Sequence, residues 1–250
     1  MRTDGITLKQ TNPTWLFPVI ADIVASGSGA IVANVLPNDQ HAIWTVVISY
    51  ILWGTSVPMA VLVLAMYYNR LMIHDVLPSQ SAVTSFITIG PLGQGAAAIQ
   101  LLGKVALKIF ERNNFIPMAP IAGQFFYLTG ILTAIIMWGF AVAWLFFALA
   151  TIVRREFKFS ISWWAFTFPL GVFTVSTTAL AQELPLRFLK VLGTVFSVVE
   201  TLLWIMVACR TIRATLNDGL FQPPSVEAWE KKAKETADDE KVEDCLAQIN

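Results

Sequence analysis

The chain has 250 residues, of which 56% are hydrophobic and 14% charged, and its mean hydropathy is +0.63. An ordinary soluble domain has a charged share near a quarter, so these values exclude that class and indicate a membrane protein. The formal net charge is zero, yet residues 217–250 carry four lysines against nine acids, whereas the first 216 residues carry 13 basic residues against eight acids. The predicted membrane part is therefore basic, and the predicted tail is acidic.

Six apolar stretches reach or approach the length of about 20 residues that crosses the hydrocarbon layer. In chain order they are Trp15 to Leu36, Ala42 to Tyr68, Ser79 to Gly103, Ile121 to Leu149, Ser160 to Leu180 and Val191 to Cys209. We predict an all-α membrane protein with a cytoplasmic segment at 1–13, a transmembrane domain at 14–213 and an acidic, largely disordered cytoplasmic tail at 214–250. The loops between spans are too short to fold as a catalytic domain, so we do not expect an enzyme.

Basic residues in the loops predict the orientation of the spans. Six spans place both termini on one side, and that side carries eight Lys or Arg residues against five on the other. Because cytoplasmic loops are enriched in basic residues, we predict that both termini are cytoplasmic. The first stretch lacks a small-residue cleavage pattern, so we expect a true span rather than a signal peptide.

The odd-numbered spans differ from the even-numbered ones. The first, third and fifth contain small, polar and helix-breaking residues at mid-depth, namely Ser26 to Gly29, Gly90 to Gly95 and Thr167 to Gly171. The fourth and sixth are bulky and apolar, and the second is mixed. The pattern predicts three tandem hairpins, each with an inward polar helix and an outward apolar helix, as in transporters built from repeats.

Proline within a span predicts a break in the helix, and broken helices in lipid typically line a wet path. Pro91 and Pro169 lie near the centres of the third and fifth predicted spans. Close packing of helices through glycine is the alternative explanation of the same small residues. The predicted substrate path is made by Ser26, Gly27, Gly90, Pro91, Gly93, Gln94, Thr167 and Pro169.

Two acids lie within the predicted spans, and an ionised acid at the centre of a span is costly enough to suggest a function. Asp22 either takes part in transport or pairs with a basic loop residue. Glu200 lies on an apolar helix, where it either relays protons or forms a hydrogen bond that supports helix packing.

The motifs of nucleotide and metal chemistry are not present. Gly103 and Lys104 are followed by Val105, where a phosphate-binding loop requires Ser or Thr. The two histidines, His41 and His74, are predicted in loops and form no metal-binding motif. We expect no cofactor, no metal and no nucleic-acid partner; the expected partners are the lipid bilayer and a small inorganic or organic anion.

Several strings resemble one known family. They are GPLGQG (90–95), MWGFAVAWLFFALA (137–150), WWAFTFPLGVFTVSTTAL (163–180), ELP (183–185) and FLKVLGTVFS (188–197). They are similar to the fungal sulfite efflux pumps of the tellurite-resistance/dicarboxylate transporter family, which also includes malic acid transporters and plant slow anion channels. The resemblance covers roughly Thr14 to Arg213.

This resemblance implies a pore of ten spans in five hairpins, plugged at mid-membrane by a phenylalanine of the ninth span. The six spans here would be the last three hairpins, and the plug is best matched by Phe168, with Phe166 and Phe173 as alternatives. We expect the first four spans to be missing, either because the sequence begins late or because two hairpins have been lost. The resemblance also implies the plasma membrane and a trimeric homo-oligomer.

Three functions follow as expectations. The first is export of a small anion, sulfite or bisulfite. The second is transport of a C4-dicarboxylate such as malate. The third, of a different class, is a truncated membrane subunit that does not transport, because three hairpins would not enclose a pore.

Overall fold

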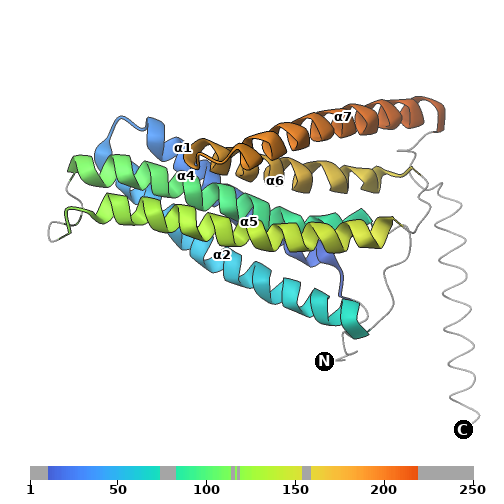
Figure 1. Cartoon of the computed structure of the whole chain (residues 1–250), viewed down its shortest axis with the longest axis horizontal. Coiled ribbons are helices and arrows are strands. Elements are labelled where there is room, and N and C mark those ends of the chain that lie inside the picture. The colour runs from blue at the N-terminus through green and yellow to red at the C-terminus, as the bar shows by residue number, and fades with distance from the viewer. Residues whose placement is uncertain (1–10, 74–82, 114–115, 117–118, 154–158, 219–250) are drawn as a thin grey trace, which may run out of the picture. The chain divides into compact units, whose positions relative to one another are not determined.

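The structure is a computed structural model of the whole chain, and it describes residues 11–73, 83–113, 116, 119–153 and 159–218. Within these ranges the long elements are all α-helices, and no strand is found. They are α1 (Phe17–Val35), α2 (Asp39–Ile73), α4 (Ile89–Asn113), α5 (Ala122–Ile152), α6 (Trp164–Glu183) and α7 (Arg187–Asp218) (Figure 1). Six stretches of the described chain are long and apolar enough to cross a membrane. The predicted all-α class and the six spans are confirmed.

The helices extend further than the apolar stretches that predicted them. The 35 residues of α2 correspond to about 52 Å of helix, whereas the hydrocarbon layer is about 30 Å thick. The helix α4 continues through Lys104, a residue expected in a loop, to Asn113. The helix α7 continues to Asp218, past the predicted domain boundary at 213. Most of the predicted tail, residues 219–250, and residues 1–10 lie outside the described residues.

The predicted breaks at the centres of the odd spans are wrong, because the irregular backbone lies at the starts of these spans. Each odd span begins with a 3-10 turn, at Pro13–Leu16, Val83–Thr88 and Ile161–Trp163, and continues as an α-helix. Pro91 is the third residue of α4, directly after the 3-10 turn that ends at Thr88. The N–H that proline lacks is therefore missing where the 3-10 turn changes into the α-helix. The helix α6 continues through Pro169 without a break.

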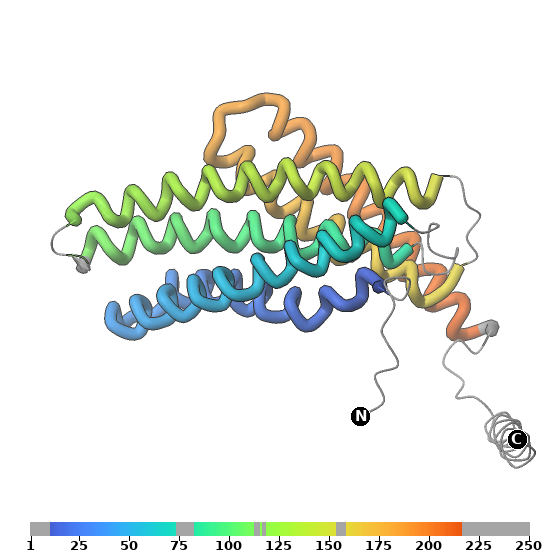
Figure 2. Tube along the Cα trace, turned by 90° about the horizontal axis from the view of Figure 1, so that it is seen from below, coloured from blue at the N-terminus to red at the C-terminus, as the bar shows by residue number. Residues whose placement is uncertain are grey.

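Burial separates the odd spans from the even spans as the sequence predicts. We compare the fraction of buried residues in an apolar 18-residue segment of each span. This fraction is 39%, 83% and 50% in the spans of α1, α4 and α6. It is 28%, 28% and 11% in the spans of α2, α5 and α7. The most buried helix, α4, packs against α1 and α6 and also against α2 and α5. Figure 2 shows α4 running between α5 and the α1/α2 hairpin. The helices α1, α4 and α6 therefore form an inner layer.

Side chains of the core connect α6 to its neighbours. The ring of Phe173 stacks on Trp138 of α5 with centroids 5.8 Å apart, and the indole nitrogen of Trp138 donates a hydrogen bond to Thr177 at 2.8 Å. On its other side Phe173 meets Phe196 of α7 edge to face at 5.2 Å. These contacts hold the face of α6 that bears Phe173 in the core.

The chain divides into two compact units after Val207. The first unit contains α1 to α6 and the larger part of α7, and all the sites below belong to it. The described part of the second unit, 208–218, is the end of α7.

Candidate functional site

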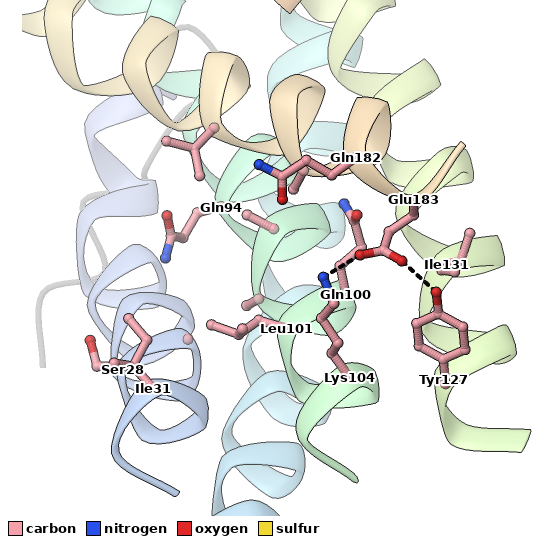
Figure 3. Close-up of a pocket in the computed structure, with 15 residues that line it drawn as sticks. Ser28, Ile31, Gln94, Gln100, Leu101, Lys104, Tyr127, Ile131, Gln182 and Glu183 are labelled. Atoms are coloured by element: carbon pink, nitrogen blue, oxygen red, sulfur yellow. Dashed lines mark hydrogen bonds and ion pairs between the residues drawn. The ribbon is translucent and has the colours of Figure 1, made fainter. Parts of the chain in front are cut away.

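Two hollows lie along the inner layer formed by α1, α4 and α6. The first, here called the aromatic hollow, has a volume of about 450 Å³ and lies near the N-terminal ends of the three spans. Its lining includes Phe17, Ile87, Trp164, Phe168 and Pro169. The second, here called the polar hollow, has a volume of about 290 Å³ and lies towards their C-terminal ends. Its lining includes Ser28, Gln94, Gln100, Lys104, Tyr127, Gln182 and Glu183 (Figure 3).

Phe168 of α6 is the plug candidate that lines one of the two hollows. It lines the aromatic hollow, whereas the polar hollow begins on α6 about two turns later, at Val175. A Cβ placed on Gly90 would lie 3.6 Å from Cε1 of the Phe168 ring, an ordinary contact distance, so the ring lies close to α4 at Gly90. Phe168 is 44% exposed although it is a large apolar side chain. Phe168 is therefore a partly exposed ring in the wall of the aromatic hollow.

The two alternative plug residues are part of the core. Phe166 is 8% exposed and meets Phe86 edge to face at 4.7 Å. Phe173 is 1% exposed and lies between Trp138 and Phe196. Neither of them lines either hollow. Among the three phenylalanines, the geometry of a plug fits Phe168.

Three of the predicted path residues line a hollow, and a fourth lies next to one. Gly27 and Gln94 line the polar hollow, and a Cβ on Gly27 would lie 3.1 Å from the amide nitrogen of Gln94. Pro169 lines the aromatic hollow, and Gly90 lies under the ring of Phe168.

The other four predicted path residues are held in helix contacts outside both hollows. The hydroxyl of buried Ser26 donates to the carbonyl oxygen of Ser49 on α2 at 2.8 Å. A Cβ on Gly93 would lie 2.9 Å from the backbone nitrogen of Phe173, so Gly93 allows α4 and α6 to approach closely. Thr167 donates to the carbonyl of Trp164 at 3.0 Å, and Pro91 is buried in the first turn of α4. For these residues the packing interpretation fits better than the path.

The two acids of the spans also lie away from the hollows. Asp22 is exposed on α1 and lines neither hollow. Glu200 of α7 lies beside α6, where its Oε1 would be 3.9 Å from a Cβ placed on Gly171. The other oxygen of Glu200 is buried without a hydrogen-bond partner among the described residues. Neither acid contributes to the two hollows.

The polar hollow contains a charged cluster that the sequence analysis did not find. The Lys104 ammonium of α4 forms an ion pair with the Glu183 carboxylate of α6, and the Tyr127 hydroxyl of α5 donates a hydrogen bond to the same carboxylate (Figure 3). The three residues are far apart in the sequence, and Lys104 was expected in a loop. The ELP string at 183–185 was noted, but no spacing in the sequence connects it to Lys104.

No group of three or more His, Cys, Asp or Glu side chains in the described part of the chain could hold a metal ion. The two hollows instead present amides, hydroxyls, one lysine paired with one glutamate, aromatic rings and aliphatic side chains. Such groups can replace part of the hydration shell of a small ion, as they do in selective pores. Hollows with such groups between membrane-spanning helices are typical of channels and transporters.

Comparison with known proteins identifies the family within this class. The family described as voltage-dependent anion channel matches residues 1–212, and the chain belongs to this family. A sulfite efflux pump of Arthroderma benhamiae is 45% identical over 216 residues, which cover 86% of this chain and 57% of the relative. A sulfite efflux pump of Candida albicans is 29% identical over 219 residues, covering 79% of this chain and 44% of that protein.

A more distant relative is named for a different anion. The malic acid transport protein of Schizosaccharomyces pombe is 22% identical over 224 residues, covering 87% of this chain and 50% of that protein. The chain thus spans about half the length of the relatives that it matches. No solved structure matches it significantly. The resemblance inferred from the strings in the sequence is confirmed, and the relatives named above are transporters.

Proposed function

We propose that this chain provides a path for a small anion, sulfite or bisulfite, out of the cell. The observation that carries the proposal is the pair of hollows along α1, α4 and α6, of which the aromatic hollow is lined by Phe168. The sulfite efflux pumps among the relatives support the choice of anion. In this proposal the anion enters the aromatic hollow from the cytoplasm, passes Phe168 and leaves through the polar hollow.

The lining of the proposed path supports an anion in physical terms. Gln94, Gln182 and Ser28 offer neutral amide and hydroxyl donors in the polar hollow, which bind an anion without trapping it. Lys104 adds an ammonium donor to the same hollow, where its charge is balanced by the Glu183 carboxylate. The proposed path consists of Gly27, Gly90, Gln94, Phe168 and Pro169, and it includes Lys104, which was not predicted.

The test is transport by sulfite-sensitive fungal cells that express the protein. We expect these cells to tolerate more sulfite and to release it faster than cells with an empty vector. Gain of malate flux without any change in sulfite tolerance would support the dicarboxylate alternative, for which the Schizosaccharomyces relative is the precedent. Correct insertion into the membrane with no flux of either anion would support the subunit that does not transport.

The proposal also includes the plasma membrane, cytoplasmic termini and a trimer. Native mass measurement of the purified protein in mild detergent tests the trimer. A monomeric mass with intact transport would remove the trimer from the proposal and leave the path unchanged.

A further inference from the structure

The charged cluster of the polar hollow joins three helices at one carboxylate. Lys104 of α4 binds one oxygen of Glu183, and Tyr127 of α5 donates to the other. Both oxygens of the carboxylate therefore have a partner, and both partners are groups that bind any oxyanion. The carboxylate also lies at the C-terminal end of α6, where the helix dipole favours the nearby positive charge of Lys104.

Exposure differs sharply between the two members of the ion pair. The side chain of Glu183 is 16% exposed, whereas that of Lys104 is 52% exposed. The Glu183 side chain is therefore largely enclosed, while about half of the Lys104 side chain is exposed, and both residues line the hollow. Gln94 and Gln182 line the same hollow and add further amide donors. A small oxyanion that enters the polar hollow can reach Lys104 without unfolding any helix.

We propose that Glu183 acts as a built-in competitor for the transported anion. In the empty hollow, Glu183 accepts from Lys104 and Tyr127; when a small oxyanion arrives, Lys104 and Tyr127 turn from the carboxylate to the anion. The ligand class is a small inorganic or organic oxyanion, because its oxygens accept the same donors as a carboxylate. The inference rests on the proposed function, since it assumes that an anion passes through the polar hollow.

Substitutions of Glu183 and Lys104 should affect anion binding differently if Glu183 competes with the anion than if the cluster only stabilises helix packing. If Glu183 competes with the anion, removing its charge leaves Lys104 uncompensated and strengthens anion binding, whereas removing Lys104 weakens it. If the cluster only holds α4, α5 and α6 together, both substitutions loosen the fold and neither strengthens binding. Opposite signs for the two variants therefore identify the competitor.

The experiment is equilibrium binding of radiolabelled sulfite to the full chain in lipid nanodiscs at fixed pH and ionic strength. We expect Lys104→Met to weaken binding about tenfold and Glu183→Gln to strengthen it about three- to tenfold, as one charge in a partly exposed site allows. Tyr127→Phe is expected to weaken binding by a smaller factor. The matched control is Lys108→Met, one turn further along α4, where the ammonium binds Asn34 at 2.9 Å; its binding should equal that of the unmodified chain.

Two outcomes overturn the inference in distinguishable ways. If the unmodified chain binds sulfite but Glu183→Gln binds it equally or more weakly, the competitor role is wrong and the proposed function stands. If the unmodified chain binds neither sulfite nor malate, the proposed function fails and the inference fails with it. Poor folding cannot imitate the expected result, because a damaged protein does not bind its ligand more tightly.

Discussion

Phe168 differs from Phe166 and Phe173 in three respects. Its side chain is partly exposed, it lines the aromatic hollow, and its ring lies next to a glycine, Gly90. It is partly exposed on the inner layer, and its ring lies against the bare backbone of Gly90. Many apolar side chains of these spans are exposed, so the feature that distinguishes Phe168 from Phe166 and Phe173 is its place in the lining of the aromatic hollow. The neighbouring proline fixes the local backbone of α6 from which the ring projects.

We predict that Phe168→Ala raises anion flux. The substitution removes the largest obstruction between the aromatic and polar hollows, and Phe168 makes fewer core contacts to lose than a buried ring does. The measurement is sulfite flux into proteoliposomes, expressed per correctly folded molecule. An increase of severalfold is expected.

The controls are Phe166→Ala and Phe173→Ala. Both rings are buried, so each truncation should cost about 3 to 5 kcal/mol of stability and reduce the yield of folded protein. Neither should raise flux per folded molecule. An equal loss of yield in all three variants, without any gain in flux, would make Phe168 an ordinary packing residue.

The acids of the spans lead to a second prediction at this scale. Asp22 and Glu200 lie outside both hollows, so Asp22→Asn and Glu200→Gln should leave sulfite flux unchanged within about twofold. The amides keep the size of the side chains and remove only the ability to ionise. A loss of flux in Glu200→Gln with normal yield would instead support the proton relay left open by the sequence.

At the scale of helices, Gly93 sets the distance between α4 and α6. A Cβ at this position would lie 2.9 Å from the nitrogen and 3.0 Å from the Cα of Phe173, and these backbone atoms cannot turn aside. We predict that Gly93→Ala destabilises the protein by about 1 to 3 kcal/mol, as overpacking typically does. Thermal unfolding in detergent measures the effect as a lower midpoint.

The matched control is Gly139→Ala in α5. No atom lies within 4 Å of a Cβ placed there, so alanine meets no steric conflict and improves helix propensity by up to about 1 kcal/mol. Its unfolding midpoint should stay equal or rise. Equal midpoints for both variants would show that α4 and α6 can separate freely at Gly93.

Hydropathy predicts the helices of this fold well because lipid imposes one simple requirement, a long apolar helix. It does not predict their ends, since α2, α4 and α7 continue into polar sequence beyond the apolar stretches. The positions of the prolines did not predict where the helices are interrupted, for a related reason. Whether a proline interrupts a helix depends on where the helix begins, and α4 begins only two residues before Pro91.

The sequence did not distinguish residues that line a hollow from residues that pack helices, because small residues serve both purposes. Gly27 lines a hollow, whereas Gly93 and Ser26 support helix packing, and the composition of a span does not reveal which face each occupies. The cluster of Lys104, Tyr127 and Glu183 was not predictable, because it depends on how three helices pack. The WWAFTFPLGVF string did predict the family, and the plug role of Phe168 within it stays a prediction.

At the scale of the whole molecule, the direction of the path depends on which side of the membrane the polar hollow faces. The polar hollow lies near the ends of the odd spans where Asp39 of α2 pairs with Arg112 of α4 at 3.6 Å. If the termini are cytoplasmic, this end faces outward and the aromatic hollow faces the cytoplasm. In that orientation an exported anion enters the aromatic hollow from the cytoplasm and leaves the protein past Lys104 in the polar hollow.

We predict that cysteines at His41 and Glu111 are labelled from outside intact cells, whereas a cysteine at Val153 is labelled only after permeabilisation. All three residues are exposed, so access is decided by the side of the membrane and not by burial. Cys209 and Cys245 are replaced by serine first, so that labelling reports only the introduced cysteine. The expected pattern follows from the eight-to-five excess of basic residues, which is a moderate bias. Labelling of Val153→Cys from outside, with His41→Cys protected, would reverse the orientation, and the anion would then meet Lys104 and Glu183 on entry from the cytoplasm and not on exit.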